Sequence, residues 1–226
     1  MKNIIVTGTS RGIGLEIALQ FAKEGNKVLA VSRNIAKELE SVKDVVCIQA
    51  DITNEGDLAK IEKYIQESWS SKVDILINNA GAIVNKPFEE ITTAEFEYIY
   101  KVNVFAVAAL TRICIPFMGI GSHVVTVSSM GGIQGSMKFP GLAAYSSSKG
   151  AVIILTELLA EEFKERGISF NAVALGAVQT EMLEEAFPGY KAPLEPAEMA
   201  CFLVDFALNG QRYFNGKTLQ ASSTTP

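Results

Sequence analysis

The sequence predicts an α/β domain, built as a doubly wound parallel sheet with helices on both faces. Short runs rich in β-branched and aliphatic residues alternate with segments whose apolar residues recur at helical spacing. Glycine or small polar residues follow most of the strand-like runs, as is typical where strands end. The predicted strands are residues 2–6, 27–31, 45–49, 73–77, 123–127, 168–173 and 217–220, and the predicted helices are residues 15–25, 54–69, 93–116, 143–166 and 195–208.

The composition indicates one ordered domain that spans residues 1–226. Hydrophobic residues make up 48% of the chain, which is enough for a substantial core. The net charge is −5 and no Lys/Arg run is present, so a nucleic-acid-binding surface is not expected. The apolar runs are short and broken, and the N-terminus leads directly into a strand. We therefore expect neither a membrane span nor a signal peptide, and we expect a cytoplasmic protein.

The cysteines and the single histidine do not suggest a metal site. Cys47, Cys114 and Cys201 lie far apart in apolar surroundings and are expected to be buried free thiols. His123 opens a strand-like run, and one histidine cannot by itself supply a zinc site or a catalytic triad. We expect His123 to be structural.

A glycine-rich turn joins the first predicted strand to the first predicted helix. Gly8, Gly12 and Gly14 form a GxxxGxG pattern in this turn. Such a turn lets the backbone approach a pyrophosphate, whose charge is stabilised at the helix N-terminus. The alternative is a tight turn without a ligand, but the strand–turn–helix context favours nucleotide binding.

The end of the second strand indicates which nicotinamide cofactor fits. An acidic residue here would bind the ribose 2′-hydroxyl of NAD, and none is present in Ser32-Arg33-Asn34. The guanidinium of Arg33 matches a phosphate, and Arg11 in the glycine turn can reach the same place. Together they favour NADP over NAD. The alternative is that both are exposed arginines without a ligand.

Polar residues also follow the third and fourth strands. Asp51 could accept hydrogen bonds from an adenine amino group, or it could cap the next helix. Asn79 is either a turn former or a group that holds neighbouring strands and a ribose in place. Ligands of such sheets bind beyond the carboxyl ends of the strands, so Asp51, Asn79, Ser129 and Gly176 should share one site.

The most informative stretch is residues 144–152. Tyr145 and Lys149 are four residues apart, and a helix places both side chains on one face. A nearby cation lowers the pKa of a tyrosine from its ordinary value of about 10. Such a pair can give or take a proton when a carbonyl is reduced or an alcohol is oxidised. On the pair alone, a surface helix that happens to carry a Tyr and a Lys is the simpler interpretation.

Asn103 is unusual in the third predicted helix. It lies among Val102, Val104 and Phe105, although Asn is a poor residue for a helix interior. A polar side chain in an apolar stretch must be hydrogen-bonded or functional. The sequence leaves both interpretations open.

Together these motifs resemble the short-chain dehydrogenase/reductase family along nearly the whole chain. The resemblance implies a Rossmann-like fold and hydride transfer to or from a nicotinamide. The matching residues, in the order of the family, are Thr7-Gly8-x-x-x-Gly12-x-Gly14, Asp51, Asn78-Asn79-Ala80-Gly81, Asn103, Ser129, Tyr145-x-x-x-Lys149 and Gly176 to Thr180.

The resemblance also implies catalytic roles. Tyr145 would donate or accept the proton, and Ser129 would donate a hydrogen bond to the reacting oxygen. Lys149 would bind the nicotinamide ribose and lower the pKa of Tyr145. Asn103 would hold a water molecule in a proton relay.

The cofactor implied by the resemblance is NADP(H), because Arg11 and Arg33 mark the NADP-preferring members. Thr180 and the backbone near Val178 would hold the nicotinamide carboxamide. The full set implied to contact the cofactor is Gly8, Ser10, Arg11, Gly12, Ile13, Gly14, Ser32, Arg33, Asp51, Ile52, Asn79, Ala80, Gly81, Val102, Tyr145, Lys149, Gly176, Val178 and Thr180.

The chain departs from the family pattern in three places. The loop before Tyr145 is a few residues longer than usual, so Ser128 stays open as the alternative to Ser129. Leu175 stands where the family usually has proline. The segment 181–194, which covers the substrate in the family, is short and implies an open site or one completed by a neighbouring subunit.

These observations predict an NADPH-dependent enzyme that reduces a small ketone, aldehyde or 3-oxoacyl-type carbonyl to an alcohol. The alternative is a non-catalytic NADP(H)-binding redox sensor or scaffold, in which a catalytic residue would be expected to be lost. The family implies a homodimer or homotetramer that associates through the long helices, and no nucleic-acid, membrane or metal partner is expected. The predicted apolar lining of the substrate site is Met130, Met137, Phe139, Met182, Leu183 and Phe187.

Overall fold

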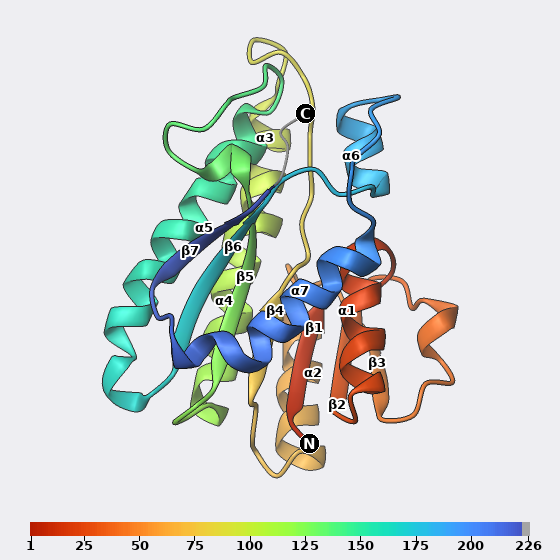
Figure 1. Cartoon of the computed structure of the whole chain (residues 1–226), viewed down its shortest axis with the longest axis vertical. Helices are drawn as coiled ribbons and strands as arrows, with labels where there is room; N and C mark the ends of the chain where they lie inside the picture. Colours follow the sequence, from red (N-terminus) through yellow and green to blue (C-terminus); the bar gives the residue numbers. More distant parts are fainter. Residues whose placement is uncertain (223–226) are drawn as a thin grey trace.

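Seven parallel strands form one sheet in the computed structural model, which describes residues 1–222 (Figure 1). The order across the sheet is β3-β2-β1-β4-β5-β6-β7, so the chain starts near the centre, winds to one edge and then winds to the other. This confirms the predicted doubly wound topology. The strands are β1 (Asn3–Thr7), β2 (Lys27–Ser32), β3 (Val45–Gln49), β4 (Ile75–Asn78), β5 (His123–Ser129), β6 (Ser169–Leu175) and β7 (Lys217–Ala221).

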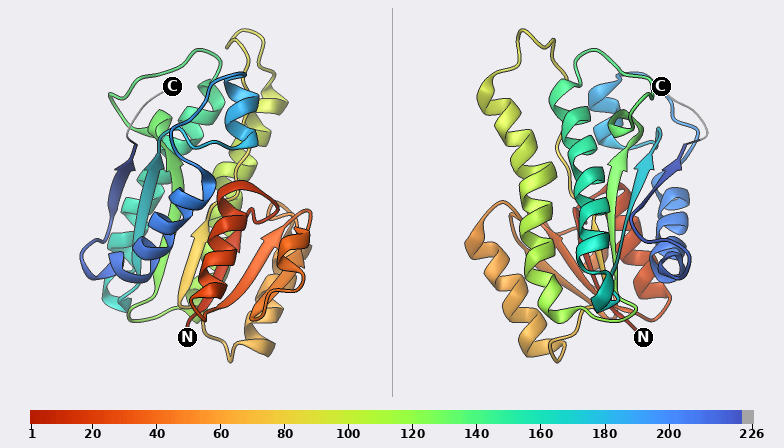
Figure 2. Two further views of the ribbon diagram at one scale, coloured as in Figure 1. Left: turned by 45° about the vertical axis from the view of Figure 1, so that its right-hand side comes forward. Right: turned by 90° about the vertical axis from the view of Figure 1, so that its left-hand side faces the viewer.

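Helices cover both faces of the sheet (Figure 2). One face carries α1 (Gly12–Lys23) and α7 (Pro196–Asn209). The other carries α2 (Glu55–Ser68), α4 (Ala106–Cys114) and α5 (Ala143–Glu162). A further short helix, α6 (Glu181–Ala186), stands beyond the carboxyl ends of the strands.

The central strands are apolar throughout because both of their faces are buried. In β1, Ile4 and Val6 pack under α1 and α7, whereas Ile5 packs under α2 and α4. All three side chains are 0% exposed. Successive side chains of a strand point to opposite faces, so a sheet covered on both sides needs a continuous apolar run.

The third predicted helix is interrupted in the structure. Instead of one helix over 93–116, the chain forms α3 (Thr93–Tyr100), a π-helical turn η2 (Lys101–Phe105), α4 and a 3₁₀ turn η3 (Ile115–Phe117). Thr92 caps α3 by accepting a hydrogen bond from the backbone N–H of Glu95. Asn103 lies in the π turn, a kind of irregularity that is common at functional sites.

The combined helix Thr93–Phe117 is long and apolar enough to cross a membrane, with a mean hydropathy of 1.4. Its inner side packs on the sheet, where Ala106, Leu110 and Cys114 belong to the core beneath α2 and α4. Packing on the sheet accounts for this apolar side. The expected lack of a membrane span stays a prediction.

The prediction of three buried thiols is right only for Cys114. Cys47 is partly exposed on the edge strand β3, and Cys201 is exposed on the outer side of α7. His123 is fully buried, with Nδ1 lying 3.0 Å from the carbonyl oxygen of Ala207 and Nε2 2.9 Å from the amide nitrogen of Asn171. It thus joins β5 to α7 and β6, as expected of a structural residue.

Candidate active site

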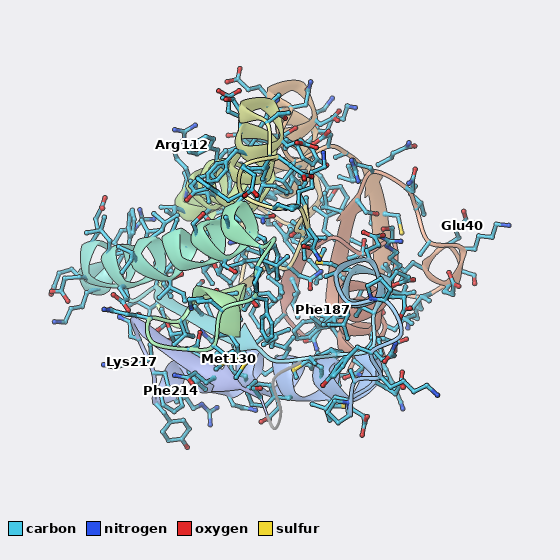
Figure 3. The ribbon with its side chains drawn as sticks, turned by 90° about the horizontal axis from the view of Figure 1, so that it is seen from above. Glu40, Arg112, Met130, Phe187, Phe214 and Lys217 are labelled. Atoms are coloured by element: carbon cyan, nitrogen blue, oxygen red, sulfur yellow. The ribbon has the colours of Figure 1, made fainter. Side chains whose placement is uncertain are left out.

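A cavity of about 340 Å³ lies beyond the carboxyl ends of the strands. Figure 3 looks down on this end of the sheet, where Met130 follows β5 and Phe187 follows α6. Every residue predicted for the cofactor or for catalysis lines this cavity, except Asn103. Segments that are up to about 170 residues apart in sequence therefore meet at one site, although the roles of the individual residues stay predictions.

The glycine turn is pressed against the end of β4. Gly8 has a φ of +75°, and a Cβ at this position would lie 2.8 Å from the Cα of Ala80. A Cβ on Gly14 would lie 2.2 Å from the carbonyl oxygen of Gly8. Side chains at these two positions would not fit, so the close packing of the turn against β4 and α1 requires glycine at both. No side chain caps α1, and its first turn contains no acidic residue.

Asn79 holds the ends of β1 and β4 together. Its amide nitrogen donates to the carbonyl oxygen of Thr7 over 2.9 Å. The hydroxyl of Thr7 in turn accepts hydrogen bonds from the backbone N–H groups of Asn79 and Ala80. Of the two interpretations of Asn79, the structure favours the strand-holding one.

Asp51 does not cap α2. Asn54 is the cap, since its side chain accepts a hydrogen bond from the backbone N–H of Asp57. One carboxylate oxygen of Asp51 instead accepts from the backbone N–H and the hydroxyl of Thr53. Asp51 thus remains at the cavity wall with its second oxygen available, which leaves the adenine role as the open interpretation.

The two arginines differ in their present contacts. Arg33 is exposed at the end of β2 and lines the cavity, and no ion pair joins it to another of residues 1–222. Arg11 forms an exposed ion pair with Glu185 of α6 at 3.4 Å. Exposed pairs of this kind contribute little energy, so Arg11 can exchange Glu185 for a phosphate at small cost.

Ser129, Tyr145 and Lys149 converge at the centre of the cavity. The Ser129 hydroxyl accepts from the backbone N–H of Gly131 over 3.2 Å and lies close enough to the phenol of Tyr145 to lower its pKa. The Lys149 ammonium lies 5.8 Å from the centre of the Tyr145 ring and donates to the carbonyl oxygen of Val127 over 2.9 Å. Burial lowers the pKa of Lys149 from 10.5 to about 8.

The pKa of Tyr145 differs from the prediction. Burial raises it above 10.0, and the hydrogen bond from Ser129 offsets this only in part. The predicted lowering by Lys149 is not found, because the ammonium is directed to the backbone of Val127 and not to the phenol oxygen. A neutral phenol is the form that can donate a proton.

Ser128 and Ser129 have different partners in α5. Ser128 is 2% exposed, and its hydroxyl donates to the carbonyl oxygen of Lys149 over 2.8 Å. Ser129 is the one that faces Tyr145. The geometry thus favours Ser129 and gives Ser128 the role of fastening α5 to β5.

Asn103 lies behind the cavity wall. Its side-chain amide donates to the carbonyl oxygen of Ala82 over 2.9 Å and accepts from the N–H of the same residue over 2.8 Å. Its nitrogen also donates to the hydroxyl of Ser148 over 3.0 Å. Both amide hydrogens are therefore used, and a relay water at this side chain would have to bind to the oxygen.

The sequence analysis missed Ser148. It is fully buried, and its hydroxyl donates to the carbonyl oxygen of Tyr145 over 2.6 Å while accepting from Asn103. It thus links the helix that carries Tyr145 to the π turn. The signal was its position three residues after Tyr145, on the same helical face.

One comparison decides the family. A family model described as short chain dehydrogenase matches residues 2–191. The chain belongs to the short-chain dehydrogenase family. The resemblance seen in the motifs is thereby confirmed.

The names of several relatives describe enzymes that act on small molecules. An NADP-dependent (R)-specific alcohol dehydrogenase of Lentilactobacillus kefiri is 33% identical over 81% of this chain and 76% of its own length. Hydroxynaphthalene reductase of Aspergillus fumigatus is 33% identical over 81% of this chain and 69% of its own length. A short chain dehydrogenase of Burkholderia cenocepacia, solved in complex with NADP, is 25% identical, covers 98% of this chain and 96% of its own, and has a TM-score of 0.86.

Proposed function

We propose that this protein is an NADP(H)-dependent oxidoreductase that reduces a ketone, aldehyde or 3-oxoacyl-type carbonyl to an alcohol. The observation that carries the proposal is the Ser129–Tyr145 hydroxyl pair, which lies in one cavity with a glycine turn and Arg33. The alternative of a redox sensor or scaffold predicts the loss of a catalytic residue. Ser129, Tyr145 and Lys149 are all present and adjacent, so no observation favours that alternative.

The cavity fits a nicotinamide dinucleotide phosphate. The glycine turn packs tightly against the end of β4 and opens α1 without a capping side chain, so the helix N-terminus would receive the pyrophosphate. Arg33, with Arg11, would hold the 2′-phosphate, and Asp51 at the cavity wall would accept a hydrogen bond from the adenine. We expect NADPH to bind at least about tenfold more tightly than NADH, a difference of about 1.4 kcal/mol.

When bound, the reduced nicotinamide supplies the hydride that is added to the carbonyl carbon. Tyr145 donates its phenolic proton to the carbonyl oxygen as negative charge develops there, and Ser129 donates a hydrogen bond to the same oxygen. The raised pKa of Tyr145 keeps the phenol protonated before the reaction. Lys149, whose ammonium donates to the backbone of Val127, would hold the cofactor ribose from the same side of the cavity.

The test is the variant Tyr145→Phe. It removes the proton donor while retaining the ring that lines the cavity, so turnover of any carbonyl with NADPH should be abolished. NADPH affinity, measured by fluorescence titration, should stay within about threefold of wild type. Full turnover by this variant would contradict the mechanism. The substrate is found by screening carbonyl compounds for NADPH oxidation.

We also propose that copies of the chain associate through the long helices, as a homodimer or homotetramer. Phe105, Ile154 and Leu158 are 61–64% exposed on η2 and α5, and the combined helix formed by α3, η2 and α4 lies beside α5 (Figure 2). Large apolar side chains on one surface are typical of association sites. Light scattering after size-exclusion chromatography should give a multiple of 24.4 kDa, and Ile154→Glu should reduce it.

A further inference from the structure

The substrate end of the cavity is almost entirely apolar. This end lies beyond Ser129 and Tyr145. It is enclosed by the loop after β4, the loop after β5 and helix α6. Its polar side chains Tyr98 and Ser146 are neutral, and the one carboxylate that α6 adds to the cavity, that of Glu181, lies beside Gly12 of the glycine turn. The apolar lining consists of Ile83, Met130, Met137, Phe139, Leu142, Met182, Leu183 and Phe187.

Three segments are fastened together over this end. The rings of Phe139, in the loop after β5, and Phe187, at the end of α6, meet edge to face with their centres 5.2 Å apart. The amide of Asn85, in the loop after β4, donates to the carbonyl oxygen of Ala186 over 2.8 Å. The cover is therefore a connected apolar wall, and its methionines adapt to the shape of an apolar ligand.

No cation of the described chain is available at this end. Among residues 1–222, the cations that line the cavity are Arg11 and Arg33 at the nucleotide end and Lys149 at the reacting centre. The ammonium of Lys149 is already bonded to the backbone of Val127.

Lys138 stands nearby but is turned away. It lies in the loop after β5, and its ammonium donates to the carbonyl oxygen of Ile133 and to the hydroxyl of Ser136 in its own loop. It lines a neighbouring hollow and not the cavity. A substrate carboxylate at this end would lose its hydration without gaining a cationic partner, which makes its binding unfavourable.

We infer that the substrate is an uncharged carbonyl compound whose body beyond the carbonyl is apolar. The inference rests on the proposed reductase function and adds that carbonyl compounds with a free carboxylate or phosphate are rejected. The rejection comes from the desolvation of the charge and not from a lack of space.

The test compares three ketones with the NADPH-loaded protein: acetophenone, 4-acetylbenzoate and methyl 4-acetylbenzoate. The first two share the ring and the ketone and differ by a carboxylate on the far side of the ring. The methyl ester controls for size. We expect kcat/KM for the carboxylate to be at least about 100-fold lower than for acetophenone and for the ester.

A variant pair tests the cause. Leu183→Arg supplies a cation at the cavity wall, whereas Leu183→Gln makes a polar change without charge. The quantity compared is the ratio of kcat/KM for acetophenone to kcat/KM for 4-acetylbenzoate. We expect Leu183→Arg to lower this ratio by at least about tenfold. Leu183→Gln should leave the ratio within about threefold of wild type. An equal narrowing by both variants would overturn the electrostatic cause.

Binding separates the failure of this inference from the failure of the proposed function. Calorimetric titration of the NADPH-loaded protein should detect the ester and not the carboxylate. If the neutral ketones bind selectively and none is reduced, the inference stands and the reductase function is contradicted. If 4-acetylbenzoate binds or reacts within about threefold of the ester, or if no neutral ketone binds, the inference is overturned.

Discussion

Lys149 should make the protein less stable at neutral pH than it is at alkaline pH. Its side chain is 5% exposed, and burial lowers its pKa from 10.5 to about 8. A depression of this size corresponds to about 3 kcal/mol. Below pH 8 Lys149 is protonated in both the folded and the unfolded chain. The buried charge then lowers the free energy of unfolding by its full amount.

Between pH 8 and 10.5 the folded protein has released this proton while the unfolded chain still holds it. The free energy of unfolding therefore rises with pH by about 1.4 kcal/mol per pH unit over this range. Lys149→Met has no such proton and fills a similar volume. We expect the variant to be more stable than wild type by up to about 3 kcal/mol at pH 7, and this advantage to disappear by about pH 10.5.

The assay is urea unfolding of the cofactor-free protein at pH 7, 8, 9 and 10, followed by circular dichroism and extrapolated linearly to water. Lys63→Met, which replaces an exposed lysine of α2, is the matched control for removal of a solvated ammonium. A difference between Lys149→Met and wild type that does not change with pH would refute the reasoning. The variant should also lose turnover, because stability and function are in conflict at this position.

Three further outcomes follow from the same contacts. Burial lowers the pKa of His123 to about 4, so His123 is protonated at a lower pH in the folded state than in the unfolded state. The free energy of unfolding should thus decrease by up to about 3 kcal/mol from pH 7 to pH 4, and urea unfolding of His123→Gln should lack this component; parallel pH curves would contradict it. Ser148→Ala leaves one of the two amide hydrogens of Asn103 without an acceptor and should lower kcat at least about fivefold, whereas Ser147→Ala removes a similar hydroxyl bond on the exposed side and should not. A purely structural role of Ser148 would lower the melting temperature and leave kcat of the folded protein equal in the two variants. Arg33→Ala should weaken NADPH about tenfold and leave NADH unchanged in fluorescence titrations, and an equal loss for both cofactors would argue against a 2′-phosphate contact.

The sequence by itself determined the strands, most of the helices and the place of the site. The alternation of apolar runs with helical patterns predicts the doubly wound sheet, because apolar residues recur with a different spacing in strands and in helices. Parallel strands all end at the same edge, so Gly8, Arg33 and Ser129 could be assigned to one cavity without coordinates. The spacing of Tyr145 and Lys149 likewise fixes their common helical face.

The tertiary structure alone decided the chemical state of these groups. The ammonium of Lys149 finds its partner in Val127, 22 residues away, and its pKa depends on how much water the packed sheet excludes. The same burial raises the pKa of Tyr145, against the expectation from sequence spacing. The choice between Ser128 and Ser129 depends on their partners in α5, because the Ser128 hydroxyl is already bonded to the carbonyl oxygen of Lys149. Burial and long-range hydrogen bonds are properties of the packed chain, and no local pattern contains them.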